Sequence, residues 1–585
     1  MNRICSLLVN YSASICITLS LIACGKNESS TTSNIVEDTK PKSSTTVTNT
    51  KNVSAEKNID QATQNKIQQE KDAKFVKAVL SSSSSSQSRL YNVEAVIPSQ
   101  CYTKTEGKNN PCLTCHQFTF ANEGRANRMD DGDLQGDYGF SDVGVKNHWK
   151  NLFEDRTERI AAIPDDEILE YINQDNYSAL APSLVARGWN GWVPDLADLQ
   201  LGAQAFDENG FAKDGSGWVA FNYMPLPSTF WPTNGSTDDV MIRLPEKFRT
   251  TAAGKYDRNI YVLNLTVVEA AIKNFRTLSI PTMNEVALGF DIDGDNKLEN
   301  AVSEMRRPTR YFGAAADEKV STFLYPVGTS FLHTVRYIGV NDKGDIYVPK
   351  RMKEVRYMVK TEFHEKSMLG NFYAEEQRDK MEGNLPRYPT LGDKGLNNKF
   401  GWHLIGFIEN ADGHLRQQVY EENLFCMGCH TTIGSTIDQT FAFARKVDGA
   451  AGWGYINLRG MQDVPVYGET MGGIASYLQK VGGGNEFRGN DELQEKYFPN
   501  GKLDLAAVNK AKDVYELIMP SRRRALDLNK AYRTIVQDQD FIFGRDANIK
   551  PLKNVFESID TEIEPLEKKF RSSFDMRLDW SKTES

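Results

Sequence analysis

The chain has 585 residues, a formal net charge of −9, and 40% hydrophobic residues. After its N-terminal segment, the remaining length and composition suffice for two or three domains with real cores. Because the charge is acidic and Lys and Arg are dispersed, we expect no nucleic-acid partner.

The first residues, 1–23, are typical of an export signal. A short basic start precedes a brief apolar run that is too short and polar for a membrane span. The run ends in Leu21-Ile22-Ala23-Cys24, which resembles the bacterial lipobox, whose Cys is acylated and becomes the first residue. The resemblance implies a lipid anchor on Cys24, and Gly25 in place of Asp favours the outer membrane, on its periplasmic or surface face. An ordinary cleavable signal with an incidental Cys is the alternative.

The next segment, 24–88, has a different composition. Ser, Thr, Asn, Lys and Glu dominate it, and Ser81–Ser86 is an unbroken serine run. Such a sequence buries too little apolar surface to offset its ordering entropy, so we predict a disordered tether, with a weak helix over 55–80 as the one exception.

Two short motifs carry the strongest chemical signal. Both read Cys-x-x-Cys-His, the attachment signature of a c-type haem: Cys112, Cys115 and His116, then Cys426, Cys429 and His430. Two thiols at this spacing can add to the two vinyl groups of one porphyrin, and the following His can bind the iron. The alternative is a zinc site in which two Cys-x-x-Cys pairs supply four thiolates, but zinc does not require a His in both copies.

The first motif lies in a predicted module, 89–200, that resembles the cytochrome c class. The pattern predicts a helix over 143–160 and another over 165–172. His148, in the first of these, is the candidate distal iron ligand of this module, against a packing or surface histidine. Cys101 has no evident partner and is interpreted as a buried thiol.

The middle segment, 201–360, reads as a β-rich domain. Apolar or alternating runs at 240–244, 259–265, 286–290, 331–337 and 345–348 predict strands of an antiparallel sheet or sandwich. Asp291, Asp293 and Asp295 resemble the start of an EF-hand loop, but Asn296 and Val302 depart from its sixth and twelfth positions. A looser Ca²⁺ loop and a plain acidic turn both remain open.

The second motif lies in the last predicted module, 361–585, which ends in a helical tail over 503–538. His364 and His403 are candidate distal ligands of the second haem, and 402–417 reads as a hairpin leading to Cys426. In the mitochondrial-type cytochrome c family the distal ligand is a Met downstream of the motif. That resemblance favours Met471, with core packing as the alternative.

The sequence therefore predicts an α+β multidomain fold, with two mainly helical cytochrome c-like modules separated by a β-rich domain. Two covalent haems in an exported, lipid-anchored chain imply electron transfer with redox partner proteins of the bacterial cell envelope. The alternative is an enzyme similar to dihaem peroxidases or oxygenases, in which one haem relays electrons and the other reacts. A surface binding protein that uses an aromatic patch around Trp218 and Tyr223 is a third class.

Overall fold

The computed structural model describes residues 95–118, 124–125, 131–227, 235–384, 386–482, 489–559 and 562–583. The chain divides into two units, Met1–Ile59 and Asp60–Ser585, and every described residue belongs to the second. The predicted signal peptide, the tether and the lipidation residue Cys24 lie outside the described residues. Within the described residues, no helix combines the length and apolar character needed to cross a membrane.

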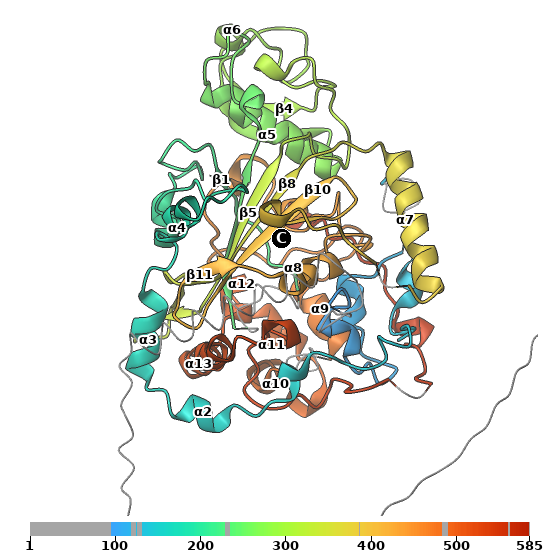
Figure 1. The fold of residues 1–585 in the computed structure, drawn as a ribbon. Coiled ribbons are helices and arrows are strands. Elements are labelled where there is room, and N and C mark those ends of the chain that lie inside the picture. Colours follow the sequence, from blue (N-terminus) through green and yellow to red (C-terminus); the bar gives the residue numbers. More distant parts are fainter. Residues whose placement is uncertain are drawn as a thin grey trace, which may run out of the picture. The chain divides into compact units, whose positions relative to one another are not determined.

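A seven-stranded antiparallel sheet forms the centre of the fold (Figure 1). Its strand order is β1-β2-β5-β8-β10-β11, and β9 pairs with β10 at the side. The strands are β1 Val219–Ala220, β2 Thr237–Arg243, β5 Ser330–Arg336, β8 Met352–Lys360, β9 Leu396–Asn397, β10 Trp402–Glu409 and β11 Leu415–Gln417. The strands predicted at 240–244 and 331–337 and the hairpin predicted over 402–417 are confirmed.

The two faces of this sheet bury different clusters. Because side chains alternate along a strand, Val240, His333 and Arg356, which are in register on β2, β5 and β8, share one face. Their neighbours Phe331 and Met358 lie on the same face in the next row. The opposite face packs Met241, Leu332 and Phe407 against Trp218 and other aromatic residues. The first face forms one wall of the candidate functional site.

Helices and two small hairpins surround the sheet. In Figure 1, α5 and α6 lie toward one end of the sheet, and α10, α11 and α13 lie toward the other. The remaining bounds are α2 Thr157–Ala161, α3 Asp165–Asn173, α4 Leu180–Ala186, α5 Arg258–Lys273, α6 Glu285–Leu288, α7 Lys366–Met381, α8 Tyr420–Leu424, α9 Gly473–Val481, α10 Asp491–Tyr497, α11 Leu505–Asn509, α12 Val514–Ile518, α13 Arg522–Asp538, β3 Thr277–Met283, β4 Val302–Arg306, β6 Gly339–Val340 and β7 Ile346–Tyr347.

Two predicted strands are helices. The run 259–265 belongs to α5, where the Asp257 side chain accepts hydrogen bonds from the backbone N–H groups of Asn259 and Ile260. All of α5 after its first two residues is buried, so it lacks the polar stripe that reveals a surface helix. A helix buried on every side has an apolar run that resembles a strand, which explains the error. The run 286–290 is largely the single turn α6.

The predicted fold class is wrong, because the described residues are mixed α/β around one large antiparallel sheet and do not form two helical cytochrome modules around a separate β domain. One apolar cluster extends from Ala95 to Leu578 and includes residues of all three predicted segments. Backbone bridges pair Thr103 with Val555 and Lys146 with Ser558, so the first motif's surroundings are completed by the end of the chain. Sequence spacing alone does not reveal such long-range pairings.

The helix predicted over 143–160 is also wrong. Only Thr157–Ala161 is α-helical there, and Lys150–Phe153 forms a single 3₁₀ turn. The helices predicted over 165–172 and within 503–538 are confirmed, the latter as α11, α12 and α13.

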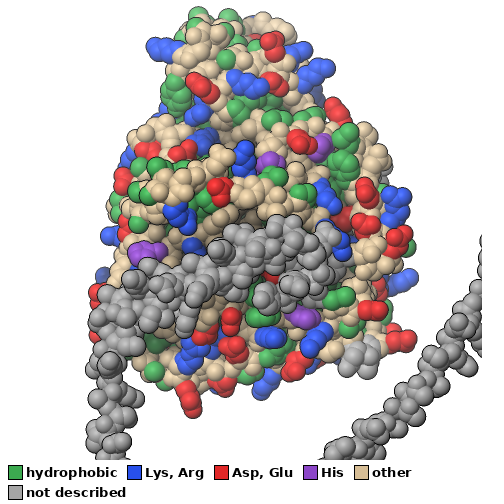
Figure 2. All heavy atoms as spheres, viewed as in Figure 1, with side chains coloured by type: hydrophobic (Ala, Val, Ile, Leu, Met, Phe, Trp, Pro, Cys, Tyr) green, Lys and Arg blue, Asp and Glu red, His purple; other side chains and the backbone are tan. Residues whose placement is uncertain are grey.

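On the face drawn in Figure 2, basic and acidic side chains are interspersed.

Candidate haem site at the two Cys-x-x-Cys-His motifs

The two motifs adopt the same local conformation. Each begins in a 3₁₀ turn, Pro111–Thr114 or Phe425–Gly428. In the first motif, the Cys115 and His116 N–H groups donate to the Cys112 carbonyl at 3.1 and 2.8 Å. In the second, the equivalent bonds to Cys426 measure 3.1 and 2.9 Å. The turn brings both thiols and the imidazole of a motif onto one short piece of backbone.

The motifs also meet, although more than half of the chain separates them in sequence. The Ser435 N–H donates to the Cys115 carbonyl at 3.1 Å, and the Gln117 side chain donates to the Gly434 carbonyl. At Gly428, an added Cβ would lie 2.9 Å from both Pro98 and the Val96 carbonyl, just upstream of the first motif. Glycine therefore permits the close approach of the two segments.

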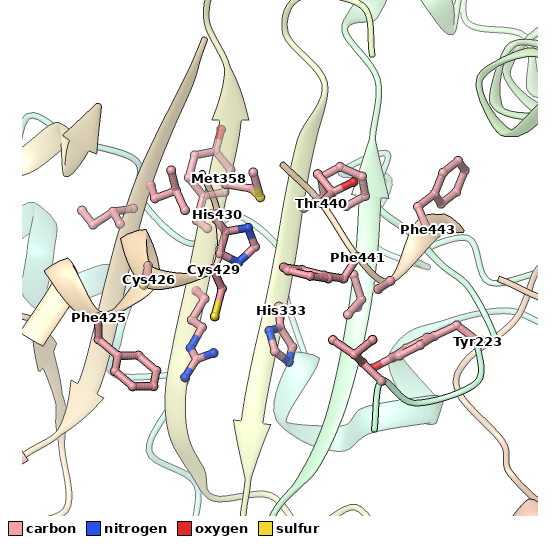
Figure 3. Close-up of a pocket in the computed structure, with 18 of the residues that line it drawn as sticks. Tyr223, His333, Met358, Phe425, Cys426, Cys429, His430, Thr440, Phe441 and Phe443 are labelled. Atoms are coloured by element: carbon pink, nitrogen blue, oxygen red, sulfur yellow. The ribbon is translucent and has the colours of Figure 1, made fainter. Parts of the chain in front are cut away.

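A cavity lies between the second motif and the first face of the sheet (Figure 3). The space free of protein atoms in and around it, open solvent included, amounts to about 1120 Å³. Cys115 of the first motif and Cys426, Cys429 and His430 of the second line it. The remaining wall is mostly apolar and includes Tyr223, Leu226, Val240, Phe331, Met358, Leu404, Phe441 and Phe443. Thiols and an imidazole in an apolar cavity fit a covalently attached porphyrin.

His430 is held in the orientation of a metal ligand. Its Nδ1 lies 2.7 Å from the Gln439 carbonyl oxygen, which fixes the tautomer with the proton on Nδ1. Burial lowers the pKa of His430 to about 4, so the imidazole is neutral at physiological pH. Nε2 then has the free lone pair, and a backbone carbonyl behind a ligating His is a common way to orient it.

The Gln439 carbonyl is presented by a strained turn. Ile437 and Thr440 exchange backbone hydrogen bonds of 3.0 and 3.1 Å across Asp438 and Gln439, whose φ angles are 49° and 60°. Such two-residue turns favour Asn-Gly or Asp-Gly, so Asp438 suits the first position and the backbone strain lies at Gln439 in the second.

Side-chain bonds hold this turn in place. Asp438 accepts from the Lys360 ammonium and from the Tyr325 N–H, and the Gln439 amide donates to Tyr373. The residues around the turn therefore specify a conformation that its own sequence does not favour.

Charged residues cluster beside the second motif. Arg356, which lines the cavity, donates to Glu354 at 2.8 Å, and Arg545 lies 2.9 Å from the same carboxylate. Burial alone would raise the pKa of Glu354, but the two guanidinium groups lower it to about 2. The Arg545 guanidinium lies 4.8 Å from the centre of the Phe425 ring. Two arginines for one carboxylate leave positive charge beside Cys426, which suits an anionic group such as a porphyrin propionate.

The surroundings of the first motif are tied to the end of the chain. The Gln135 amide donates to the His116 carbonyl at 3.3 Å and to the Ser572 carbonyl at 2.6 Å. Burial raises the pKa of Cys112 to about 11. Burial, together with the nearby Cys112 and Cys429, raises the pKa of Cys101 to about 12, which places this thiol close to both motifs.

The distal ligands predicted from sequence do not line the cavity. His148 lies in a loop next to Trp149, where burial and two neighbouring lysines lower its pKa. His364 lies 3.4 Å from the Glu362 carboxylate and contacts Phe372. His403 precedes Leu404 on β10 and so points to the opposite face of the sheet. Met471 packs on the large core just before α9.

His333 is the histidine that sequence analysis missed. It lies on β5 and points into the cavity that His430 also enters (Figure 3). It is the one residue of β5 that is not fully buried, because its side chain faces the cavity. The available signal was a histidine at the centre of the predicted strand 331–337.

The acidic loop holds a different set of carboxylates from the predicted one. Glu285, Asp291 and Asp293 have ligand oxygens within 4.8 Å of one another, whereas Asp295 pairs with the exposed Lys297. Each of the three already accepts backbone N–H groups; Asp291, for example, accepts from Gly294 at 2.8 Å. Among the described residues, no group of motif cysteines converges in this way.

The chain belongs to a family of lipoproteins. A family model described as "-like lipoprotein" matches residues 85–510. A protein of Aquifex aeolicus (strain VF5), titled "Uncharacterized lipoprotein", is 32% identical over 517 residues, which cover 78% of this chain and 86% of the relative. No solved structure matches. Membership agrees with a lipid anchor at the cell envelope, as the sequence around Cys24 predicts.

Proposed function

We propose that the protein is a dihaem c-type cytochrome that carries electrons at the bacterial cell envelope. The observation that carries the proposal is the cavity lined by thiols of both Cys-x-x-Cys-His motifs, Cys115 from the first and Cys426 and Cys429 from the second. Two redox groups attached at adjoining motifs would lie close together, as electron exchange between them requires.

The residues that would hold the two haems follow from the motifs. Cys112 and Cys115 would attach one, with His116 as proximal ligand, and Cys426 and Cys429 the other, with His430. When bound, haem supplies an iron that accepts and donates one electron. The chain orients His430 through the Gln439 carbonyl, excludes water with the apolar wall, and offers Arg356 to a propionate.

We also propose that the protein is anchored in the outer membrane and exchanges electrons with other proteins of the cell envelope. Gly25 after the lipobox Cys favours the outer membrane, and redox partner proteins of the envelope would deliver and accept the electrons. Basic and acidic residues interspersed on the face in Figure 2 suit brief, weakly steered encounters with such partners.

A dihaem peroxidase or oxygenase is the second candidate, and one observation favours it. His333 and Arg356 are direct cross-strand neighbours that both line the cavity. A histidine and an arginine beside an open iron position could move a proton and stabilise negative charge on a bound peroxide.

Reductive titration of the purified full-length protein separates these functions. An electron carrier should take up two electrons per chain, show six-coordinate spectra and leave added hydrogen peroxide unconsumed. Rapid peroxide consumption with an equivalent oxidation of an electron donor would contradict the first function and favour the second.

We also propose that the acidic loop binds Ca²⁺ weakly, because Glu285, Asp291 and Asp293 bring three carboxylates together. Calorimetric titration should detect millimolar binding that Asp291→Asn abolishes. Equal heats from the variant would show that the loop is a plain acidic turn.

A further inference from the structure

We infer that His333 is the second axial ligand of the haem attached at Cys426 and Cys429, with His430 as the first. This inference rests on the proposed function, since it presupposes a haem at the second motif. It adds a ligand that lies outside both motifs and on the central sheet.

The position of His333 on the sheet is the first observation that supports this inference. His333 pairs with Val240 on β2 and with Arg356 on β8, so it stands in the middle of the sheet face that forms the cavity wall. In Figure 3, the His333 and His430 side chains enter the same cavity, His333 from β5 and His430 from the segment that follows Cys429. Strand residues are rigidly placed, which suits a metal ligand better than a loop does.

The surroundings of His333 are the second observation that supports this inference. Its Nε2 lies 3.6 Å from Asp238, which is 6% exposed and accepts a hydrogen bond from Tyr223. At 3.6 Å this carboxylate is beyond hydrogen-bond distance from His333, but it lies beside the imidazole, and carboxylates near ligating histidines are usual in metal sites.

Met358 is the competing ligand, because its thioether also lines the cavity. It lies directly across from Phe331 in the strand register and is 7% exposed. Unlike His333, it lies in a row of apolar residues on the sheet, in register with Ile242, Phe331 and Leu404. We therefore assign Met358 to the apolar wall.

The role of His333 decides between the two candidate functions of the second haem. An iron held by two histidines has no open position for peroxide, so His333 as ligand favours electron transfer. His333 as an acid–base group beside an open position would favour the enzyme.

The test uses the full-length protein with attached haem and reads spin state by electron paramagnetic resonance and absorption. The variants are His333→Ala and His333→Met, with Met358→Leu and His403→Ala as controls. His403 lies on the same sheet but on the opposite face. We expect one of the two haems to become high-spin in His333→Ala, to return to low-spin on addition of imidazole, and to stay low-spin in both controls.

Other results would overturn the inference in distinct ways. A low-spin spectrum that His333→Ala leaves unchanged, or one that Met358→Leu alone converts, assigns the ligand elsewhere. A high-spin second haem in the unaltered protein, with two haems still attached, refutes the ligand but not the haem proposal. If no haem is attached, both proposals fail. Should His333→Ala lose its haem, His333→Met decides: a low-spin spectrum with a sulfur-to-iron band supports the assignment, and a high-spin one refutes it.

Discussion

The buried ion pair between Lys360 and Asp438 gives the most quantitative prediction. Both side chains are almost fully buried, at 1% and 0% exposure, and Asp438 begins the strained pair whose second residue orients His430. Replacing Lys360 by Met should lower the free energy of unfolding by about 3–5 kcal/mol, because it leaves a carboxylate buried without its cation. The Tyr325 N–H, at 2.8 Å, satisfies only part of that carboxylate.

The complementary variant, Asp438→Asn, should have a similar cost. Asn tolerates the left-handed backbone conformation, so the loss reports the charge rather than the turn. Burial lowers the pKa of Lys360 and Asp438 opposes this shift, so removing the carboxylate leaves an ammonium that burial destabilises. The double variant removes both charges and should recover to within about 2 kcal/mol of the original protein.

Urea unfolding followed by circular dichroism measures all four proteins of this double-mutant cycle. Lys297→Met is the control, since Lys297 pairs with Asp295 on the surface and should change stability by less than about 1 kcal/mol. Additive losses, with the double variant the least stable of all, would refute the reasoning. So would a Lys360→Met variant as stable as the control.

Three further predictions concern other parts of the chain. Burial raises the pKa of Asp463 from 3.8 to about 6, so the folded state binds the carboxyl proton more tightly than the unfolded state does. The free energy of unfolding should therefore fall as the pH rises from about 4 to 6, by about 1.4 kcal/mol for each unit by which the pKa is raised. Asp463→Asn should remove this pH dependence when it is measured by urea titrations at a series of pH values. An unchanged slope in the variant would contradict this cause. Because the pKa of Cys101 is about 12, its thiol should resist iodoacetamide in the folded protein and react after unfolding, and Cys101→Ser should keep both haems; rapid labelling of the folded protein would contradict a buried, protonated thiol. Cys24→Ser should move the protein from the membrane to the soluble fraction in cell fractionation, and continued membrane retention would argue against acylation.

The shared backbone conformation of the two motifs is a local feature. Cys112, Cys115 and His116 lie on one turn of backbone, and the equivalent residues at Cys426 do the same. Strands β2, β5 and β10 were also predictable, since each has an apolar or alternating pattern between turns.

The long-range contacts could not be predicted from the sequence. The bond from Ser435 to Cys115 and the bridge from Thr103 to Val555 join segments that no local pattern relates. Because of these contacts, the chain forms one core that contains both motifs, and not the two modules that were expected. His333 was missed for the same reason, because its place in the cavity wall depends on strand register. The helix α5 was misassigned because its almost complete burial removed the helical period.

The most direct test of the account is the number of covalent haems on the purified chain. Intact-mass spectrometry and the pyridine haemochrome spectrum should give two haems c per protein. They should give one when both cysteines of either motif are replaced by alanine, and none when all four are replaced. A mature chain without added haem mass, produced in a bacterium that attaches haem c, would contradict the account at its centre.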